Sequence, residues 1–230
     1  MTTTPLLEID DLALAHHDRT VFGPITTTLP RSALVVVHGP SGSGRSALLL
    51  ALAGRMRGTT GTLRFTDAPV GTADTQGLRR RWRERRAGRA HRRTASIARV
   101  AEVVDLERQL TVTESVTERC LADHVPVGRG HVRFTALCER IQTSFPPQAL
   151  VGELDALDQV VLTTVLAMLR PASLVVLDDV DRDLDSAGQT EMYAILQRFA
   201  ATGCTIVAST CDHEPIPDDV PTITLTQGAP

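Results

Sequence analysis

The chain has 230 residues, of which 42% are hydrophobic, and a formal net charge of −3. This size allows one large globular domain, or a core with inserted subdomains, and is enough to bury a substantial core. No apolar run approaches the ~20 residues that a membrane span needs, and the first residues lack the basic and apolar segments of a signal peptide. We therefore expect a cytosolic protein whose membrane role would need a partner.

Alternating strand and helix patterns run through the chain. Apolar or alternating runs predict strands at 7–12, 34–38, 61–65, 173–178 and 204–209, with a further extended segment at 221–225. Helical patterns occupy 47–53, 111–121, 132–144, 157–169 and 189–201. This alternation is typical of an α/β protein with a mainly parallel sheet and helices on both faces. The four cysteines have no C-x-x-C spacing, which indicates free thiols rather than a zinc site or disulfides.

A glycine-rich segment between the strand at 34–38 and the helix at 47–53 has the pattern of a phosphate-binding loop. It fits G-x-x-x-x-G-K-[ST] at every position except that Arg45 replaces lysine. Its backbone N–H groups would cradle phosphates, the Ser46 hydroxyl would bind Mg²⁺, and the cation would reach the β- and γ-phosphates. The nucleotide-binding candidates are Gly39, Pro40, Ser41, Gly42, Ser43, Gly44, Arg45, Ser46 and Ala47. The alternative is a simple Gly/Ser turn before a helix.

The substitution at Arg45 changes the chemistry of this loop. Arginine keeps the positive charge but is bulkier and planar, so it is not equivalent to lysine. All 24 basic residues of the chain are arginine, so part of the change reflects composition.

Two acidic residues, Asp178 and Asp179, stand at the end of the strand predicted at 173–178 and directly after it. The buried run delivers Asp178 to the magnesium shell, while Asp179 is placed to orient or deprotonate an attacking water. Such a strand end is a weak signal alone, but it becomes strong downstream of a phosphate loop.

The order of these segments resembles the ATP-binding-cassette (ABC) ATPases over residues 7 to 212. The similarity includes the opening at 7–46, the run Leu110–Val116 that resembles the segment after the family's Q-loop, and Leu184-Asp185 at the end of its D-loop. The resemblance implies a P-loop NTPase fold of ABC type in a single domain over 1–230. That fold has an N-terminal antiparallel β-subdomain and an inserted helical subdomain near 103–156. It also implies Mg²⁺ and ATP as cofactors, a membrane permease as partner, and a peripheral location at the inner face of the cell membrane.

Several family positions carry different residues. The adenine-stacking aromatic falls at His16, the Q-loop glutamine at Glu102, the catalytic glutamate at Asp179 and the switch histidine at Cys211. The signature falls at 154–158, which reads Leu-Asp-Ala-Leu-Asp instead of Leu-Ser-Gly-Gly-Gln. Its two carboxylates would repel the phosphates of an ATP bound to a partner subunit. A homodimer is therefore expected to close poorly, whereas a heterodimer with a more complete subunit would still turn over.

Two functions from different classes follow. The first is an ATPase subunit of a membrane transport complex that hydrolyses Mg-ATP weakly or only with a partner, with Asp179, Glu102 and Cys211 as candidate catalytic residues and Ser46 and Asp178 as metal ligands. The second is a nucleotide-sensing regulatory or scaffold subunit that does not hydrolyse. A small-molecule kinase is less favoured, because it would leave Leu110–Val116 and Leu184-Asp185 unexplained.

An arginine-rich run precedes the predicted Q-loop position. Between Arg79 and Arg93 stand nine arginines and one glutamate, while the chain as a whole is acidic. A solvated face is the favoured interpretation, followed by contact with anionic lipid headgroups or a permease. Nucleic acid is unlikely as a partner on this reasoning, since only one aromatic residue interleaves with the arginines.

Overall fold

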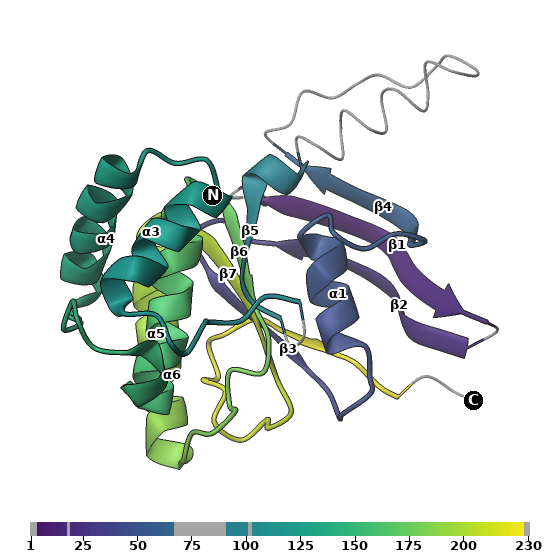
Figure 1. The fold of residues 1–230 in the computed structure, drawn as a ribbon. Helices are drawn as coiled ribbons and strands as arrows, with labels where there is room; N and C mark the ends of the chain where they lie inside the picture. Colours follow the sequence, from purple (N-terminus) through teal and green to yellow (C-terminus); the bar gives the residue numbers. More distant parts are fainter. Residues whose placement is uncertain (1–3, 18, 67–90, 101–102, 228–230) are drawn as a thin grey trace, which may run out of the picture.

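A computed structural model describes residues 4–17, 19–66, 91–100 and 103–227. The chain forms two sheets with helices packed around them (Figure 1). The antiparallel sheet has the order β2-β1-β4, and the parallel sheet has the order β5-β6-β7-β3-β8. The expected α/β fold, with a parallel sheet and an N-terminal antiparallel sheet, is confirmed.

The parallel sheet is built from the short aliphatic runs. It contains β3 (Leu34–His38), β5 (Ala95–Arg99), β6 (Leu174–Leu177), β7 (Thr205–Thr210) and β8 (Thr222–Thr224). The central strands β6 and β7 are buried along their whole length, because helices cover one face while the antiparallel sheet and α1 cover the other. Continuous Val, Leu and Ile runs suit strands that are buried on both faces.

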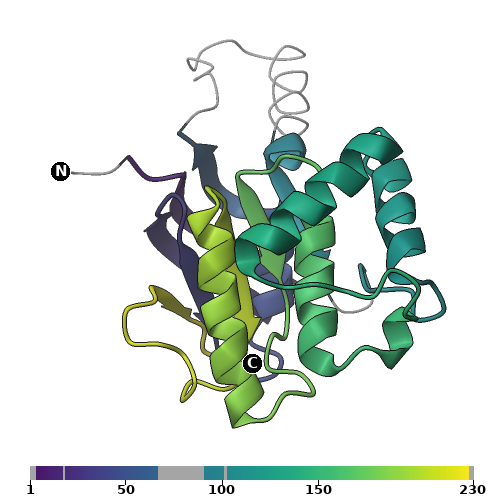
Figure 2. The same ribbon diagram turned by 90° about the vertical axis from the view of Figure 1, so that its left-hand side faces the viewer.

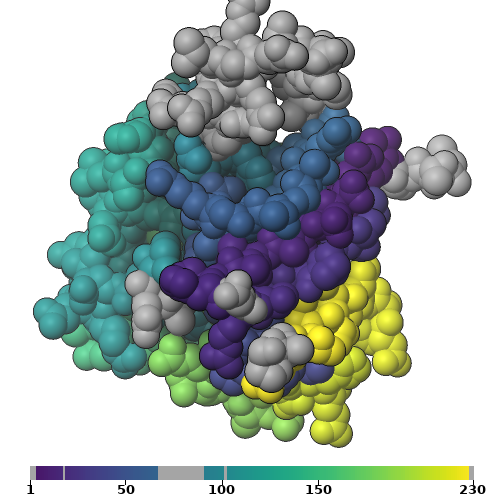
Figure 3. All heavy atoms as spheres, turned by 90° about the vertical axis from the view of Figure 1, so that its right-hand side faces the viewer, coloured from purple at the N-terminus to yellow at the C-terminus, as the bar shows by residue number. Residues whose placement is uncertain are grey.

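The antiparallel sheet contains β1 (Leu7–His16), β2 (Arg19–Leu29) and β4 (Thr60–Phe65). Its register is interrupted between Ile9 and Leu12 on the β2 side, which breaks the strict alternation in β1. The strand predicted at 7–12 continues past this interruption to His16. Figure 3 shows this sheet, in purple and blue, covering one face of the molecule above the C-terminal segment in yellow.

Two cores lie on opposite faces of the parallel sheet. On one face, α1 (Arg45–Leu52) packs with the antiparallel sheet against alternate residues such as Val35 and Val37. On the other face, the intervening residues such as Val36 belong to a core that includes α5 (Ala156–Ala167) and α6 (Ser186–Ala201). Figure 2 shows these two helices side by side against the sheet.

A pair of helices extends the second core. It consists of α3 (Val112–Ala122) and α4 (Val127–Ile141), and a short 3-10 turn, η1 (Val151–Glu153), leads on to α5. Thr111 and Glu114 form a reciprocal capping box at the start of α3, which satisfies two backbone N–H groups. Gly130 is buried where α4 meets Cys120 of α3. These helices lie within the expected insertion at 103–156, whose boundaries remain a prediction.

Several element boundaries differ from the sequence predictions. The helix predicted at 132–144 begins at Val127 and ends at Ile141, and the helix predicted at 189–201 begins at Ser186, where Asp185 caps it. Strand β5 was not predicted from its short Ala-Ser-Ile-Ala-Arg sequence. No helix in the described part of the chain is long and apolar enough to cross a membrane.

Candidate functional site

The glycine-rich loop connects β3 to α1 at the carboxyl edge of the parallel sheet. Gly44 has φ 88°, and a Cβ there would lie 2.2 Å from the Val21 carbonyl oxygen, so only glycine fits without movement. A Cβ at Gly39 would lie 2.7 Å from the Ser43 hydroxyl. The start of α1 has no side-chain cap and no acidic residue in its first turn. Its first backbone N–H groups are therefore available to an anion.

Asp178 directly follows β6 at the same edge of the sheet. It is 1% exposed, and one carboxylate oxygen accepts a hydrogen bond from the Ser209 hydroxyl. The other oxygen, Oδ2, is buried and has no protein partner. The hydroxyl of Ser43 in the loop is also buried without a partner. Buried polar atoms of this kind require an explanation, and a bound cation with its water shell would satisfy the carboxylate.

Arg45 bends back across the strand ends. Its Nη1 donates to the carbonyl oxygens of Gly39 and Thr210, the latter at 3.2 Å, and lies 2.7 Å from Cys211 Sγ. Its Nη2 lies 3.0 Å from Asp179 Oδ1. The guanidinium thus joins the carboxyl ends of β3, β7 and β6, where ligands of open parallel sheets bind. Arg45, the cationic residue of the loop, therefore donates its hydrogen bonds to acceptors within the protein.

Asp179 sits in a left-handed turn, with φ 46°. Burial is the main cause that raises the pKa of its carboxyl, followed by the neighbouring charge of Asp178, while Arg45 acts in the opposite direction. Arg99, at the end of β5, donates to the backbone carbonyls of Asp178 and Asp179. Ser209 accepts the Asp179 N–H at 3.1 Å. The acidic turn is therefore held from both neighbouring strands.

The segment after β7 is tied to this turn by Asp181. Its Oδ2 accepts the N–H groups of Cys211 at 3.0 Å and Asp212 at 3.3 Å. The Cys211 thiol is exposed apart from its contact with Arg45. His213 turns its ring against His38, with 4.9 Å between the ring centroids. The structure thus brings Arg45, Asp178, Asp179 and Cys211 together at one edge.

Other predicted residues lie around this cluster or outside the described chain. Ser46 and Ala47 form the first turn of α1 and are half-buried, and the loop residues Pro40, Ser41 and Gly42 are exposed. His16 ends β1, where its ring packs edge-on against His17 at 4.0 Å. Glu102 lies outside the described residues, as do residues 79–90 of the arginine-rich run.

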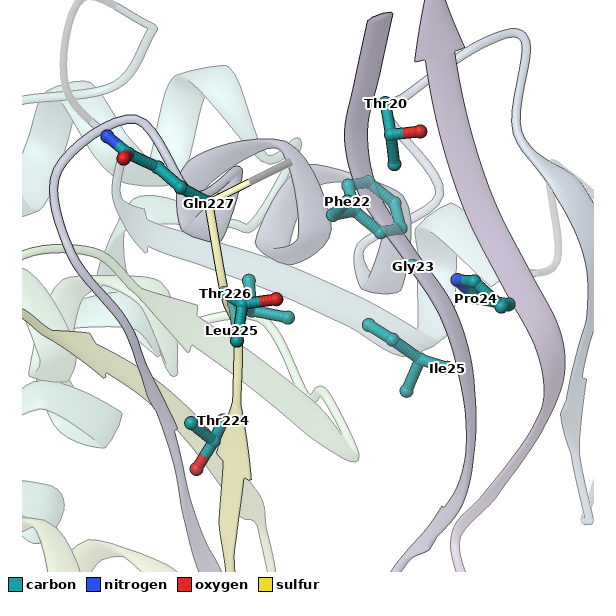
Figure 4. Close-up of a pocket in the computed structure, with 9 residues that line it drawn as sticks. All are labelled: Thr20, Phe22, Gly23, Pro24, Ile25, Thr224, Leu225, Thr226 and Gln227. Atoms are coloured by element: carbon teal, nitrogen blue, oxygen red, sulfur yellow. The ribbon is translucent and has the colours of Figure 1, made fainter. Parts of the chain in front are cut away.

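A pocket of about 380 Å³ adjoins the loop between β2 and the segment that follows β8 (Figure 4). Its lining is uncharged: Thr20, Phe22, Gly23, Pro24, Ile25, Thr224, Leu225, Thr226 and Gln227. Gln227 Nε2 donates to the Ser41 carbonyl at 3.3 Å, and Leu225 N–H donates to His38 O at 2.7 Å. The segment that follows β8 thus contacts both the loop and the end of β3.

The sequence model of a family described as "ABC transporter" matches residues 22–200, which is most of the chain. The chain belongs to the ABC transporter family. Relatives that match this chain include proteins named as ATP-binding proteins.

Two relatives in the family match this chain over nearly its whole length. The nickel import ATP-binding protein LarO of Lactiplantibacillus plantarum is 26% identical over 218 residues, which cover 92% of this chain and 84% of LarO. The cytochrome c biogenesis ATP-binding export protein CcmA of Hyphomonas neptunium is 26% identical, with 94% and 95% covered. By contrast, the chain spans 31% of the pyoverdine export ATP-binding/permease protein PvdT of Pseudomonas fluorescens, to which it is 26% identical.

Solved ABC cassettes share the fold. A nucleotide-free ATP-binding cassette from an ABC transporter superposes with a TM-score of 0.73 at 10% identity, covering 97% of this chain and 88% of that one. CbiO1 from Clostridium perfringens, described as part of the CbiONQ complex, gives 0.70 at 16% identity, with 90% and 79% covered.

The segment 154–158, where the sequence predicts the ABC signature, has a local structural role in this chain. Asp155 is the N-cap of α5, and its Oδ1 accepts the Asp158 N–H at 2.7 Å. Burial is the main cause that raises the pKa of Asp158, and the charges of Asp155 and Glu191 add to it. The N-terminus of α5 is thus capped by the chain's own carboxylate, which occupies the Asp158 N–H group that could otherwise meet an anion.

Proposed function

We propose that this ABC family member is the Mg-ATP-binding subunit of a membrane transport complex, and that it hydrolyses ATP weakly or only with a partner subunit. The observation that carries the proposal is the uncapped loop-to-helix junction beside a buried carboxylate, Asp178, that has one unpartnered oxygen. The backbone N–H groups at the start of α1 would hold phosphates, and Arg45 would supply the loop's positive charge.

Mg²⁺ fits the groups at this edge of the sheet. Ser46 and Asp178 would hold it, because a hydroxyl and a carboxylate are ligands that Mg²⁺ prefers. When bound, the ion neutralises charge on the phosphates. Ser209 positions Asp178 by donating to its other oxygen, so the unpartnered Oδ2 remains for the ion or its waters.

Weak hydrolysis is proposed from three positions. Asp179 is one methylene shorter than glutamate, and its Oδ1 is held by Arg45, so this oxygen is less available to contact an attacking water. Cys211 replaces the imidazole of the switch position. Asp155 keeps a carboxylate at the start of α5, where a partner's nucleotide would approach. Glu102 remains a candidate catalytic residue on sequence grounds, and His16 remains a candidate for contact with the base.

A non-hydrolysing regulatory or scaffold subunit is the second candidate. It is favoured by the same engagement of Asp179 and by the capped signature position. Either function places the chain at a membrane permease on the inner face of the membrane, as a homodimer or heterodimer of nucleotide-binding subunits. The structurally similar CbiO1 is described as part of an ABC transporter complex, which supports membership of a transport complex by likeness.

Calorimetry with Mg-ATP, followed by phosphate release in the same buffer, tests the proposal. Ser46→Ala should abolish the Mg²⁺-dependent part of binding, whereas Ser144→Ala should leave it unchanged, because Ser144 is exposed after α4. Binding with turnover supports the ATPase, and binding without turnover supports the regulatory subunit. Equal Mg-ATP affinity in the wild type and Ser46→Ala would refute the metal assignment.

A further inference from the structure

The guanidinium of Arg45 is occupied by acceptors from distant parts of the chain. Its side chain is 9% exposed. Nη1 donates to the backbone carbonyls of Gly39 and Thr210, and Nη2 pairs with the carboxylate of Asp179. These acceptors come from the ends of three different strands. The position of the cation is therefore set by the chain itself, before any ligand arrives.

A carboxylate and a terminal phosphate offer this cation the same chemistry. Both present anionic oxygens that accept charge-assisted hydrogen bonds from a planar guanidinium. In a phosphate-binding loop, the backbone N–H groups hold the inner phosphates and the cation reaches the outermost ones. Asp179 Oδ1, at 3.0 Å from Nη2, therefore holds a nitrogen that an outer phosphate oxygen would use.

We propose that Asp179 is a specificity-determining residue that competes with the terminal phosphate for Arg45, so that the site favours nucleoside diphosphate over triphosphate until this pair opens. The inference rests on the proposed nucleotide binding and concerns the same site. A diphosphate can use the loop N–H groups and leave the Arg45–Asp179 pair in place. A triphosphate must displace the carboxylate or remain beside its negative charge.

Because the backbone carbonyls bind Nη1, the competition between Asp179 and a phosphate concerns only Nη2 of the guanidinium. Gly39 and Thr210 hold Nη1 whether or not Asp179 is charged, so neutralising Asp179 should free Nη2 without releasing the arginine. Asp179 is about one-third exposed, so solvent screens part of the pair. We therefore expect a change of about tenfold in affinity, which corresponds to one charge-assisted hydrogen bond of this kind.

The test compares Asp179→Asn with Asp183→Asn. Both positions have positive φ, 46° and 63°, a conformation that asparagine tolerates, and both substitutions remove one negative charge. Asp183 is 79% exposed and pairs with Arg182, so it controls for the change in net charge. Calorimetry would measure the Kd of Mg-ADP and of the Mg²⁺ complex of the non-hydrolysable β,γ-imido analogue of ATP. Light scattering of the same samples would report dimer formation.

We expect Asp179→Asn to tighten the triphosphate analogue about tenfold, to change ADP by less than twofold, and to do so in monomeric protein. Asp183→Asn should leave the ratio of the two affinities as in the wild type. The gain should shrink when Asp179→Asn is made in an Arg45→Ala background. A gain of the same size in that background, or one that appears only with dimer formation, would overturn the competition.

Two negative outcomes separate this inference from the proposed function. If the wild type binds both nucleotides and Asp179→Asn leaves their ratio unchanged, the competition is wrong and nucleotide binding stands. If neither the wild type nor Asp179→Asn binds either nucleotide, the proposed nucleotide binding fails, and the inference fails with it.

Discussion

Two glycines in the same helix, Gly128 and Gly130 of α4, should respond in opposite ways to alanine. A Cβ at Gly130 would lie 2.0 Å from Cys120 Sγ, a fully buried atom of α3, whereas a Cβ at Gly128 meets nothing within 4 Å. Alanine is favoured over glycine in a helix by about 0.5–1 kcal/mol. Gly128→Ala should therefore stabilise the protein by about 0.5 kcal/mol. Gly130→Ala adds an overpacking cost of about 1–3 kcal/mol and should destabilise it by about 1–2 kcal/mol.

Urea unfolding followed by circular dichroism would measure both free energies of unfolding. The rescue variant is Cys120→Ala, which removes the sulfur that the new methyl group would meet. In that background, Gly130→Ala should cost less than in the wild type, because the two side chains no longer overlap. If Gly130→Ala is as stable as Gly128→Ala, α3 and α4 are not packed as described and the steric argument fails.

Three further outcomes follow from the buried groups. Ser209→Ala should lower the free energy of unfolding by about 1–3 kcal/mol, since it leaves the Asp178 carboxylate without its hydroxyl donor, and urea titration would measure this. Asp158→Asn should raise the free energy of unfolding at pH 7, because the raised pKa of Asp158 means that its ionised form costs stability in the folded protein. This gain should fade as the pH falls through the raised pKa, and it should vanish below the pKa that Asp158 has in the unfolded chain. A gain that does not depend on pH would contradict this reasoning. A thiol-reactive dye at pH 8 should label the exposed Cys211 quickly in the native state, while the three other cysteines, which are buried, react only after unfolding. Rapid labelling of more than one thiol in the native protein would contradict this prediction.

The strand-loop-helix arrangement around the glycine-rich loop, and the position of Asp178 after a strand, could be predicted because their signals are local. A short aliphatic run, a glycine pattern and the next helix follow one another along the chain, and Asp178 comes directly after a second aliphatic run. The capping role of Asp155 also has a local signal, an aspartate just before a helical pattern, whereas the resemblance to the ABC family predicts only that its charge repels a partner's phosphates.

The direction of the Arg45 side chain could not be predicted from its neighbours. Its partners Asp179 and Thr210 are distant in sequence and meet it only because the order of strands brings β3, β6 and β7 together. Strand β5 was missed for a related reason: its Ala and Ser side chains carry little intrinsic strand preference, so pairing with β6 determines its conformation.

Strand β3, which leads into the glycine-rich loop, pairs with two strands that come more than 160 residues later in the sequence. Its partners are β7 and β8, at residues 205–210 and 222–224, and Leu225 adds a hydrogen bond to His38. During synthesis from the N-terminus, the loop therefore leaves the ribosome long before the strands that hold it. We expect β3 and the loop to reach their native arrangement only after residues 205–225 have left the ribosome, because those residues supply the pairing partners of β3.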